Sequence, residues 1–465
     1  LIKGKFDATP ANATALVIER GAKIYAVGTP DCPIVFTAQA DPMDGTYAFT
    51  NKGQWGGVVI LGKATNNLTL AANGPFQPGV GDGKLAVADG VGTMEGFASS
   101  NSKDQFGGTD DNDNSGILKY VSIRFAGAIL QVGGELNALS LGSVGAGTTI
   151  DHIDIVSSAD DGIEAWGGTV NIKYASMLFG NDDMFDWDDG YRGKVQFLFS
   201  LKTDNTASLD ADNGFEMDSD DQKSNNTPRS HPVIFNATMI GNNKTTQTSD
   251  NSAIAAINAK ELTEGEISNS VFANYKYGLN LVKALGTRTG TSEAYHNWAN
   301  TGGNGTNSLK IKCNTFVNFT STSGAGDVMV DLSVDKNPSL VSGTDRTQFT
   351  TTDLNVTAAT IAGFNPALTI NNATATITVA PDATPNPALS VAGCPTAPVD
   401  GFFVPAAYRG AFAPSGKSWL ADWTYNAITK AVQGSQPCPT DINQDGSTSG
   451  ADLNSLLQSF GQQCK

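Results

Sequence analysis

The sequence predicts an all-β protein, and within that class a parallel β-helix, in which short strands stack coil upon coil. Residues 152–158, 169–179 and 194–200 carry apolar side chains at alternate positions, which is the period of a pleated strand. Gly- and Asp-rich corners separate these blocks, and equivalent positions recur about every 20 to 25 residues, the spacing of one solenoid coil. The 51 glycines and the low charged fraction of 16% agree with many short strands and corners.

The same alternation defines the expected extent of the solenoid. It begins in residues 14–38, resumes at 117–124 and continues to about 309–319, so we expect a β-helix over residues 1–320. Residues 63–114 are polar and Gly-rich, which predicts an insertion into the scaffold. Residues 321–424 are Thr- and Pro-rich and are expected to form an irregular β region. A linker at 425–437 then leads to a small module at 438–465.

Aromatic residues are concentrated at the end of the irregular region. The residues are Phe402, Phe403, Tyr408, Phe412, Trp419 and Trp423. Terminal coils of a solenoid need a cover, so we expect this segment to cap the open apolar end. An aromatic platform for sugar binding is the alternative interpretation.

The charge balance excludes one class of partner. There are 46 acidic and 29 basic residues, a formal net charge of −17. Such a surface repels nucleic acid, and the sequence has no basic aromatic patch that would compensate. Acidic clusters suit Ca²⁺, although simple solubility explains many individual carboxylates equally well.

Five cysteines, with no CxxC pair among them, argue against a zinc or redox site and favour an oxidising compartment. We expect Cys438 to pair with Cys464, and Cys313 with Cys394 is a candidate second bridge. Cys32 is then left either buried as a small apolar residue or paired with a part of the precursor.

Neither a signal peptide nor a run of 18 apolar residues occurs, so the sequence predicts no transmembrane segment. The opening Leu-Ile-Lys-Gly-Lys looks like the interior of a coil. We therefore expect a secreted, extracellular or cell-surface protein, cut from a longer precursor whose signal peptide has been removed.

The sharpest short motif is an EF-hand-type loop at the C-terminus. Gly446 occupies position six, where such loops turn sharply, and oxygen ligands at the surrounding spacing suit Ca²⁺. The predicted ligands are Asp441, Asn443, Asp445, Ser447 through its carbonyl, and Asp452. Leu453, Leu456, Leu457 and Phe460 then give the following helix one apolar face.

Two family resemblances follow from these residues. The blocks GAKIYAVGTPDCPIVFTA, QWGGVVILG, DNSGILKYVSIRFAG, SADDGIEAWGGTVNIKYASMLFGNDDMFDWDDGYRGKVQF and FFVPAAYRGAF resemble secreted bacterial surface proteins, which implies export and a right-handed β-helix. The C-terminal loop and helix resemble one repeat of a dockerin. A dockerin normally has two repeats, so the single repeat puts cohesin binding in doubt and leaves anchoring or contact with a neighbouring copy.

An acidic strip in the solenoid raises the question of catalysis. Its carboxylates are Asp160, Asp161, Glu164, Asp182, Asp183, Asp186, Asp188, Asp189, Glu216 and Asp218. Arg192 is the nearest candidate base or sugar-carboxylate ligand, as a lyase would require, whereas a hydrolase needs two carboxylates at a defined separation. The pair Asp160-Asp161 resembles that of polygalacturonases, but the accompanying Gly-His-Gly and Arg-Ile-Lys signatures are absent. Turn chemistry is the preferred interpretation, with structural Ca²⁺ and then catalysis as alternatives.

The function that the sequence favours is a non-catalytic extracellular structural protein, stabilised by calcium. Its open coil ends invite contact with further copies, head to tail, which produces filaments. Its expected partners are therefore itself or a cell-surface component. The alternative is a carbohydrate-active, pectate-lyase-like enzyme or a glycan-binding adhesin.

The predicted calcium loop can be tested by substitution. Changing Asp441→Ala together with Asp445→Ala removes two of the oxygen ligands, so the part of the Ca²⁺-dependent rise in melting temperature that comes from this loop should be lost. Thermal unfolding with Ca²⁺ and with chelator measures this. Identical melting of the unsubstituted chain in both conditions would contradict a calcium site.

Overall fold

The computed structural model describes most of the solenoid and the segment that follows it. The described residues are 1–7, 13–70, 86–97, 101–131, 134–202, 213–220, 226–242, 255–283, 294–299, 308–319, 328–330, 342–358, 360–367, 369–371, 376–379, 381–383, 389–429 and 431. The dockerin-like module at 438–465, with its ligands Asp441, Asn443, Asp445, Ser447 and Asp452 and the Cys438–Cys464 pair, lies outside them.

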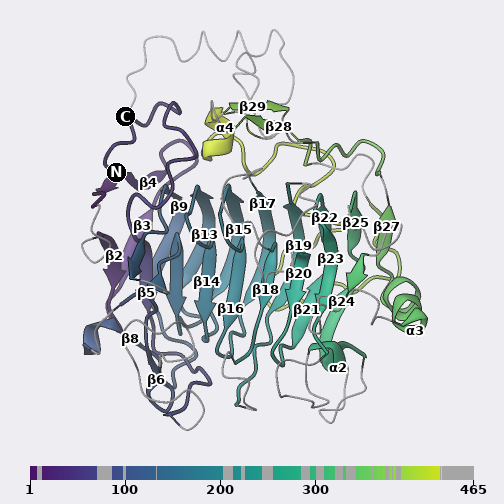
Figure 1. Ribbon diagram of the computed structural model, residues 1–465, viewed down its shortest axis with the longest axis horizontal. Helices are drawn as coiled ribbons and strands as arrows, with labels where there is room; N and C mark the ends of the chain where they lie inside the picture. The colour runs from purple at the N-terminus through teal and green to yellow at the C-terminus, as the bar shows by residue number, and fades with distance from the viewer. Residues whose placement is uncertain are drawn as a thin grey trace.

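Two long sheets of parallel strands confirm the parallel β-helix, and Figure 1 shows their strands succeeding one another along the molecule. The first sheet contains β1 (Ile2–Gly4), β3 (Ile24–Val27), β4 (Ile34–Ala38), β9 (Gly116–Arg124), β13 (Thr149–Val156), β15 (Asn171–Leu178), β17 (Lys194–Leu201), β19 (Val233–Ile240), β21 (Gly265–Ser268), β22 (Val271–Ala273), β24 (Leu309–Lys312), β25 (Thr315–Val317) and β27 (Val356–Ala358). The second sheet contains β2 (Ala15–Ile18), β5 (Gly57–Leu61), β12 (Leu139–Gly142), β14 (Ile163–Trp166), β16 (Phe185–Asp188), β18 (Phe215–Met217), β20 (Ala255–Ala259), β23 (Tyr277–Leu281) and β26 (Met329–Val330). β26 and β27 extend both sheets beyond residue 320.

Shorter elements lie between and beside the coils. Among the described residues these are an antiparallel sheet of β6 (Ala86–Ala88), β7 (Val91–Thr93) and β8 (Gln105–Phe106), the hairpins β10 (Ile129–Gln131) with β11 (Gly134–Glu135) and β28 (Thr369–Asn371) with β29 (Thr376–Val379), and the helices η3 (Ser102–Asp104), α2 (Ala294–Ala299), α3 (Gly343–Thr347), η5 (Gln348–Thr352) and α4 (Tyr425–Thr429). None of the described helices is long and apolar enough to span a membrane.

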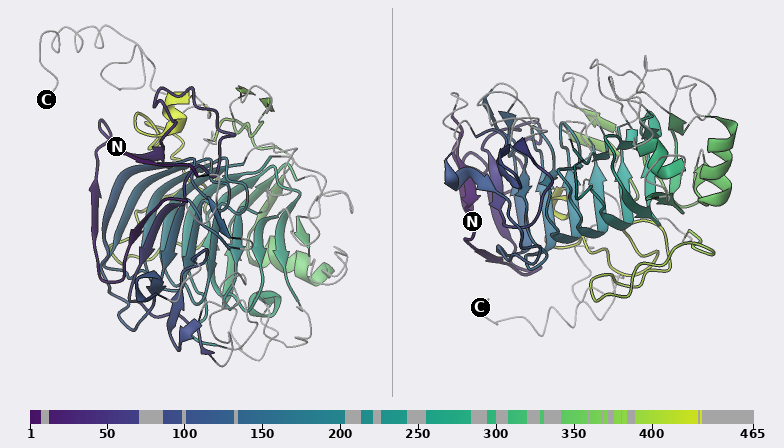
Figure 2. Two further views of the ribbon diagram at one scale, coloured as in Figure 1. Left: turned by 60° about the vertical axis from the view of Figure 1, so that its left-hand side comes forward. Right: turned by 90° about the horizontal axis from the view of Figure 1, so that it is seen from below.

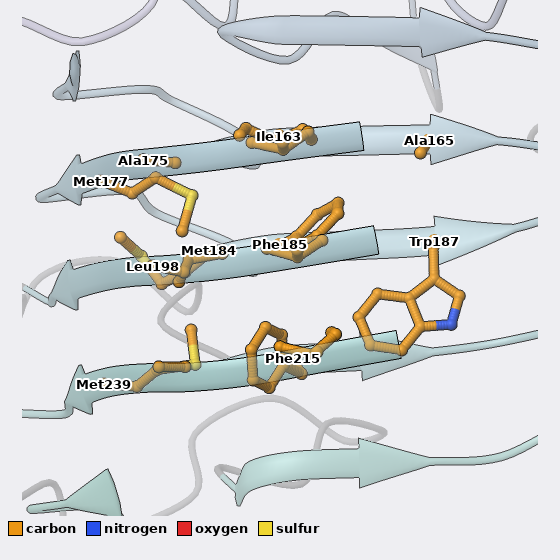
Figure 3. Close-up of a cluster of buried hydrophobic side chains, with 14 of the residues drawn as sticks. Ile163, Ala165, Ala175, Met177, Met184, Phe185, Trp187, Leu198, Phe215 and Met239 are labelled. Carbon is orange, nitrogen blue, oxygen red and sulfur yellow. The ribbon is translucent and has the colours of Figure 1, made fainter. Parts of the chain in front are cut away.

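The strands stack in register, which places chemically similar side chains in rows. Thr149 pairs with Asn171, so one coil takes 22 residues there, as the sequence spacing predicts. In the second sheet Ile163, Phe185 and Phe215 pair successively and all point inward, where Figure 3 shows them beside Met177 and Met239 in the core. These side chains are fully buried, so each row removes a continuous strip of apolar surface from water.

A bend in the middle of successive first-sheet strands creates a second kind of row. Tyr120, His152, Tyr174, Phe197 and Asn236 occupy equivalent positions, and each has a positive φ between 50° and 60°. Such backbone is unfavourable for non-glycine residues and must be held by its surroundings. The first four side chains stack ring on ring, with centroid separations of 4.3, 4.4 and 4.9 Å. His152 is therefore a packed member of this row, here called the aromatic ladder.

The described parts of the insertion, 63–70, 86–97 and 101–114, cover the outer face of the second sheet at its N-terminal end. Leu68, Met94 and Phe106 are buried there against Val59 and Leu61 of β5. The outward positions of β5 are apolar, so they need this cover. Further along the sheet the outward positions become acidic and the insertion ends.

The aromatic segment does not cap the end of the solenoid, contrary to the sequence-based expectation. Residues 389–429, here called the strap, lie along the side of the first sheet, as Figure 2 (right) shows for this yellow-green segment. Tyr408 accepts a hydrogen bond from Asn236, and the Tyr425 amide donates to Asp154 at 3.0 Å. The reason is an outward apolar row on the strands, which the strap covers. That row is Val156, Leu178, Leu201 and Ile240.

Covalent and polar contacts fasten the strap. Cys313 and Cys394 form a disulfide, which confirms the candidate bridge, and Cys32 is free and exposed, so it is not the buried apolar residue of one interpretation. Arg409 is buried and donates to the carbonyl of Asn314 at 2.9 Å. The first part of the predicted linker is α4, whose Tyr425 packs against the first sheet.

Because the inward rows are closely packed, a substitution that leaves a cavity in them should lower the free energy of unfolding considerably. Phe185→Ala should lower the free energy of unfolding by about 3 to 5 kcal/mol, because it removes a fully buried ring from a rigid stack. Val27→Ala in β3, where the side chain is 54% exposed, should change it by no more than about 0.5 kcal/mol. Urea unfolding of both variants measures the difference. Equal effects at the two positions would contradict the assigned core.

Candidate functional site

An acidic cleft of about 440 Å³ lies on the outer face of the second sheet, beyond the insertion. Its lining residues are Glu95, Ile129, Glu135, Ala159, Asp160, Asp161, Glu164, Trp166, Asp182, Asp183, Asp186, Asp188, Glu216, Asp218 and Lys260. Lys260 is the basic member of this set. The cleft therefore concentrates negative charge on a surface that the solenoid holds rigid.

The strand register brings three of the carboxylates together. Glu164 of β14 pairs with Asp186 of β16, which pairs with Glu216 of β18. Neighbouring strands are about 4.8 Å apart, so the three outward side chains form a column of like charges. Alternation explains their direction, because the residues on either side of each carboxylate point into the core.

A second column comes from the corners that lead into the second sheet. There a side-chain oxygen of one coil accepts a hydrogen bond from the backbone N–H of the next. Asn137 accepts from Asp161 at 3.1 Å, Asp161 from Asp183 at 2.7 Å, Asp183 from Asn213, and Asn213 from Ala255 at 3.0 Å. This row of Asn137, Asp161, Asp183 and Asn213, here called the Asn–Asp ladder, satisfies buried backbone donors at each corner and so stabilises the stacking of the coils.

The ladder needs an oxygen acceptor but not a charge. Asn137 and Asn213 perform the same role as Asp161 and Asp183 with a neutral amide. The negative charge at the two aspartates is therefore not required for coil stacking. Their second carboxylate oxygens add to the charge of the cleft, whose wall both residues form.

The carboxylates at one end of the cleft fit a hard divalent cation. Asp161, Glu164 and Asp186 each offer one oxygen, and these oxygens lie within 4.8 Å of one another. A second set, Asp160, Asp161 and Asp182, meets the same criterion. Ca²⁺ binds oxygen at about 2.3 to 2.6 Å, so two oxygens on opposite sides of one ion are about 5 Å apart. The 4.8 Å within which each set of oxygens lies is close to that separation.

Burial and mutual repulsion raise the proton affinity of this group. Burial, together with the charges of Asp160, Asp182 and Asp186, raises the pKa of Asp161 well above its ordinary value. Burial and the charge of Glu216 do the same to the pKa of Asp183. A bound cation would relieve both effects, because it replaces lost solvation and screens the repulsion.

The other end of the cleft is neutralised by Lys260, from the corner after β20. Its ammonium contacts Glu216 and lies 3.2 Å from Asp218. Although burial opposes ionisation, Lys260 and hydrogen bonds to neighbouring side chains lower the pKa of Glu216 to about 2. Burial raises the pKa of Asp218 well above its ordinary value despite Lys260. Burial lowers the pKa of Lys260, but the charges of Asp218 and Glu216 outweigh it and raise the pKa well above its ordinary value.

Residues from outside the second sheet form the walls. Glu95 comes from the insertion, and Ile129 and Glu135 come from the hairpin of β10 and β11. Trp166 is buried where the insertion ends, packed in the same cluster as Leu61 and Phe106. The insertion thus contributes to the wall of the cleft through Glu95.

Nine of the ten carboxylates singled out in the sequence line the cleft. The exception, Asp189, lies in the corner after β16, where its carbonyl accepts from the Asn67 amide. Arg192, the proposed base, is not in the cleft, because its guanidinium binds the Asp111 carboxylate of the insertion at 3.1 and 3.2 Å. Lys260, which follows β20 at the coil position equivalent to Asp218, was not singled out from the sequence.

Comparison with known proteins gives one family. Residues 4–344 match the family model described as pectate-lyase like beta helix domain. No curated protein and no solved structure gave a match.

The ion pairs of Lys260 predict a pH-dependent loss of stability on substitution. Lys260→Met should cost about 2 to 3 kcal/mol at neutral pH, because Glu216 and Asp218 then share a cleft without their counter-ion; the side chain is 28% exposed, which reduces the cost below that of a fully buried pair. In the wild type the pKa of Glu216 is about 2, below the ordinary 4.5, so its contribution is present above pH 4.5 and is lost as the pH falls toward 2. The difference between the two proteins should therefore shrink over that interval.

Chemical denaturation at several pH values tests this. Lys310→Met, which removes a 47% exposed lysine 3.7 Å from Glu266, is the matched control and should cost less than about 1 kcal/mol at every pH. A Lys260→Met cost that does not vary between pH 2 and 7 would show that the ion pairs contribute nothing.

Proposed function

The chain belongs to the pectate-lyase-like β-helix domain family, and we propose that it is a non-catalytic extracellular protein whose acidic cleft binds Ca²⁺ and, with the ion, a glycan. The observation that carries the proposal is the set Asp161, Glu164 and Asp186, whose oxygens converge within 4.8 Å on one face. Family membership supplies the scaffold but does not by itself supply the activity.

The cation is supported by a comparison between the two ends of the cleft. At one end Lys260 compensates Glu216 and Asp218. At the other end the oxygens of Asp161, Glu164 and Asp186 lie within 4.8 Å of one another, and Lys202 donates to the backbone carbonyl of Asp182. Like charges this near raise one another's pKa and destabilise the fold, so an oxygen-seeking cation is the natural counter-ion.

A glycan is supported by the chemistry and shape of the same cleft. Carboxylates form strong charge-assisted hydrogen bonds with hydroxyl groups. A bound divalent ion accepts hydroxyl or carboxylate oxygens in its remaining coordination positions, since Ca²⁺ takes about 6 to 8 oxygen ligands. The three protein carboxylates leave positions for such oxygens.

The state of the basic residues argues against lyase chemistry. A general base must lose its proton near the operating pH. Lys260 holds its proton more tightly than a free lysine, because Asp218 and Glu216 raise its pKa. Arg192 is engaged by Asp111 outside the cleft. Neither of the two is therefore suited to abstract a proton from a sugar bound there.

Glycoside hydrolysis is the second candidate, and one observation favours it. Glu216 has a pKa of about 2, while the pKa of Asp218 is raised. The two residues are two positions apart at the end of β18, so they lie on the same face. Two carboxyl groups whose environments shift their pKa values in opposite directions are the arrangement that glycosidases use. Lys260 lies between the two groups, so a substrate would have to displace it. New reducing ends from a panel of polysaccharides, lost in Glu216→Gln, would favour this candidate over binding alone.

The disulfide between Cys313 and Cys394 supports an oxidising, extracellular location. Head-to-tail assembly and calcium binding by the C-terminal loop, through Asp441, Asn443, Asp445, Ser447 and Asp452, belong to the same proposal. They rest on the sequence, and the outcome of electron microscopy with Ca²⁺ and with chelator decides whether filaments form.

The cleft can be tested separately from the C-terminal loop. In the full chain carrying Asp441→Ala and Asp445→Ala, remaining Ca²⁺ binding measured by calorimetry should come from the cleft. Adding Asp161→Asn and Asp186→Asn should weaken this binding by at least about tenfold, because two charged ligands are lost. Asparagine at position 161 keeps a side-chain oxygen that can accept the backbone N–H of the next coil, as the side-chain oxygens of Asn137 and Asn213 do.

The control pair is Asp31→Asn with Asp44→Asn, which removes two exposed carboxylates away from the cleft. It should leave Ca²⁺ binding unchanged. Equal binding by the cleft variant and the control pair would disprove the cation site.

A further inference from the structure

A second recess, of about 230 Å³, lies on a different face of the solenoid, between the strap and the first sheet. Its lining residues are Tyr174, Phe197, Val404, Pro405, Tyr408, Ala411, Phe412, Ala413, Gly416, Lys417, Ser418 and Trp419. Five of these residues are aromatic. No carboxylate lines the recess among the described residues, which distinguishes it from the acidic cleft.

The solenoid side of the recess is where the aromatic ladder ends. Tyr174 and Phe197 stack at 4.9 Å with an angle of 18° between the rings, and they are the last aromatic members of the ladder. The next ladder residue, Asn236, instead donates a hydrogen bond to the strap carbonyl of Tyr408 at 2.8 Å. The strap is thereby held over the place where the ring stack stops.

The strap side of the recess is also fixed. Trp419 stacks on Phe412 at 5.7 Å with an interplanar angle of 12°, and its indole N–H donates to the Ala411 carbonyl at 2.9 Å. Ala411 in turn donates its amide N–H to Thr238 of β19 at 2.8 Å. The aromatic walls are therefore positioned before any ligand binds, which reduces the entropy cost of binding.

A few polar groups complete the lining. Burial raises the pKa of the Tyr408 phenol to about 12 and also raises that of Tyr174, so both groups are neutral hydroxyls at physiological pH. Ser418 adds an aliphatic hydroxyl, and Lys417 at the rim pairs with Asp422. Aromatic surface with a small number of polar groups is the usual composition of a small-molecule site.

We propose that this recess binds one neutral pyranose ring of a polysaccharide chain. Such a ring has an apolar C–H face, which suits the aromatic walls, and hydroxyl groups around its edge, which suit Tyr174, Tyr408 and Ser418. A purely apolar ligand would make no hydrogen bond with these hydroxyls, of which Ser418 already accepts one from the Leu420 amide at 3.3 Å. The Lys417 ammonium disfavours a cation, and the net charge of −17 disfavours an anion.

Binding here differs from binding in the acidic cleft in its requirement for metal. No carboxylate is available among the described lining residues to hold Ca²⁺, so the recess should bind sugar in the presence of chelator. This inference is independent of the proposed function, because the two sites lie on different sheets.

The test uses the full chain in chelator and four neutral tetrasaccharides: cellotetraose, xylotetraose, mannotetraose and laminaritetraose. Calorimetry and tryptophan fluorescence should detect binding of at least one of them. Trp419→Ala should weaken it by about tenfold or more, because a main stacking surface is lost. Asp161→Asn with Asp186→Asn should not change it.

A blocking substitution avoids the risk that Trp419→Ala loosens the strap. Ala413 is exposed and lines the recess, whereas Ser415 is exposed nearby and does not. Ala413→Tyr should abolish binding by filling the recess, and Ser415→Tyr should leave it intact. Absence of binding to all four tetrasaccharides, or equal binding by these two variants, would overturn the proposal.

Discussion

The stacking of each coil on the next in one register is the constraint on which the rest of this structure depends. Because pairs such as Ile163 with Phe185 and Glu164 with Asp186 are aligned residue by residue, a side chain has little choice of neighbour. Inward rows bury apolar surface continuously, and this burial is the main favourable contribution to folding. The same register forces the outward residues into rows, even where bringing them together is unfavourable.

The acidic cleft is a consequence of that constraint. The backbone holds adjacent strands about 4.8 Å apart, so carboxylates that project from paired positions stay close to one another. The core offsets their repulsion, and burial together with the charges of Asp160, Asp182 and Asp186 raises the pKa of Asp161. Lys260 relieves the repulsion at one end, and the proposed cation relieves it at the other. The Asn–Asp ladder shows that coil stacking does not require the charge at Asp161.

Much of this arrangement was predictable from the sequence, because alternation and coil spacing are local patterns. They gave the parallel β-helix and placed Asp161, Glu164 and Asp186 in one acidic strip. Contacts between distant segments were not predictable in the same way. Arg192 lies near the acidic strip in sequence, but its partner Asp111 comes from the insertion, 81 residues earlier. Lys260 reaches the cleft only because a coil with long corners brings β20 beside β18.

The strap illustrates the same limit. Its aromatic residues predicted a cap on the open end of the solenoid, whereas the apolar surface that they cover is the side of the first sheet. The outward row that begins at Val156 is interrupted in sequence by whole coils, so it becomes visible only when the strands are stacked. The recess beside Trp419 follows from this position, since a terminal cap would not have met Tyr174 and Phe197.

The central claim, that register concentrates carboxylates into a cation site, is tested most directly by anomalous diffraction from crystals grown with saturating Ca²⁺. An anomalous peak bounded by Asp161, Glu164 and Asp186 is the expected result. A well-ordered cleft in which these three side chains hold no ion would contradict the account.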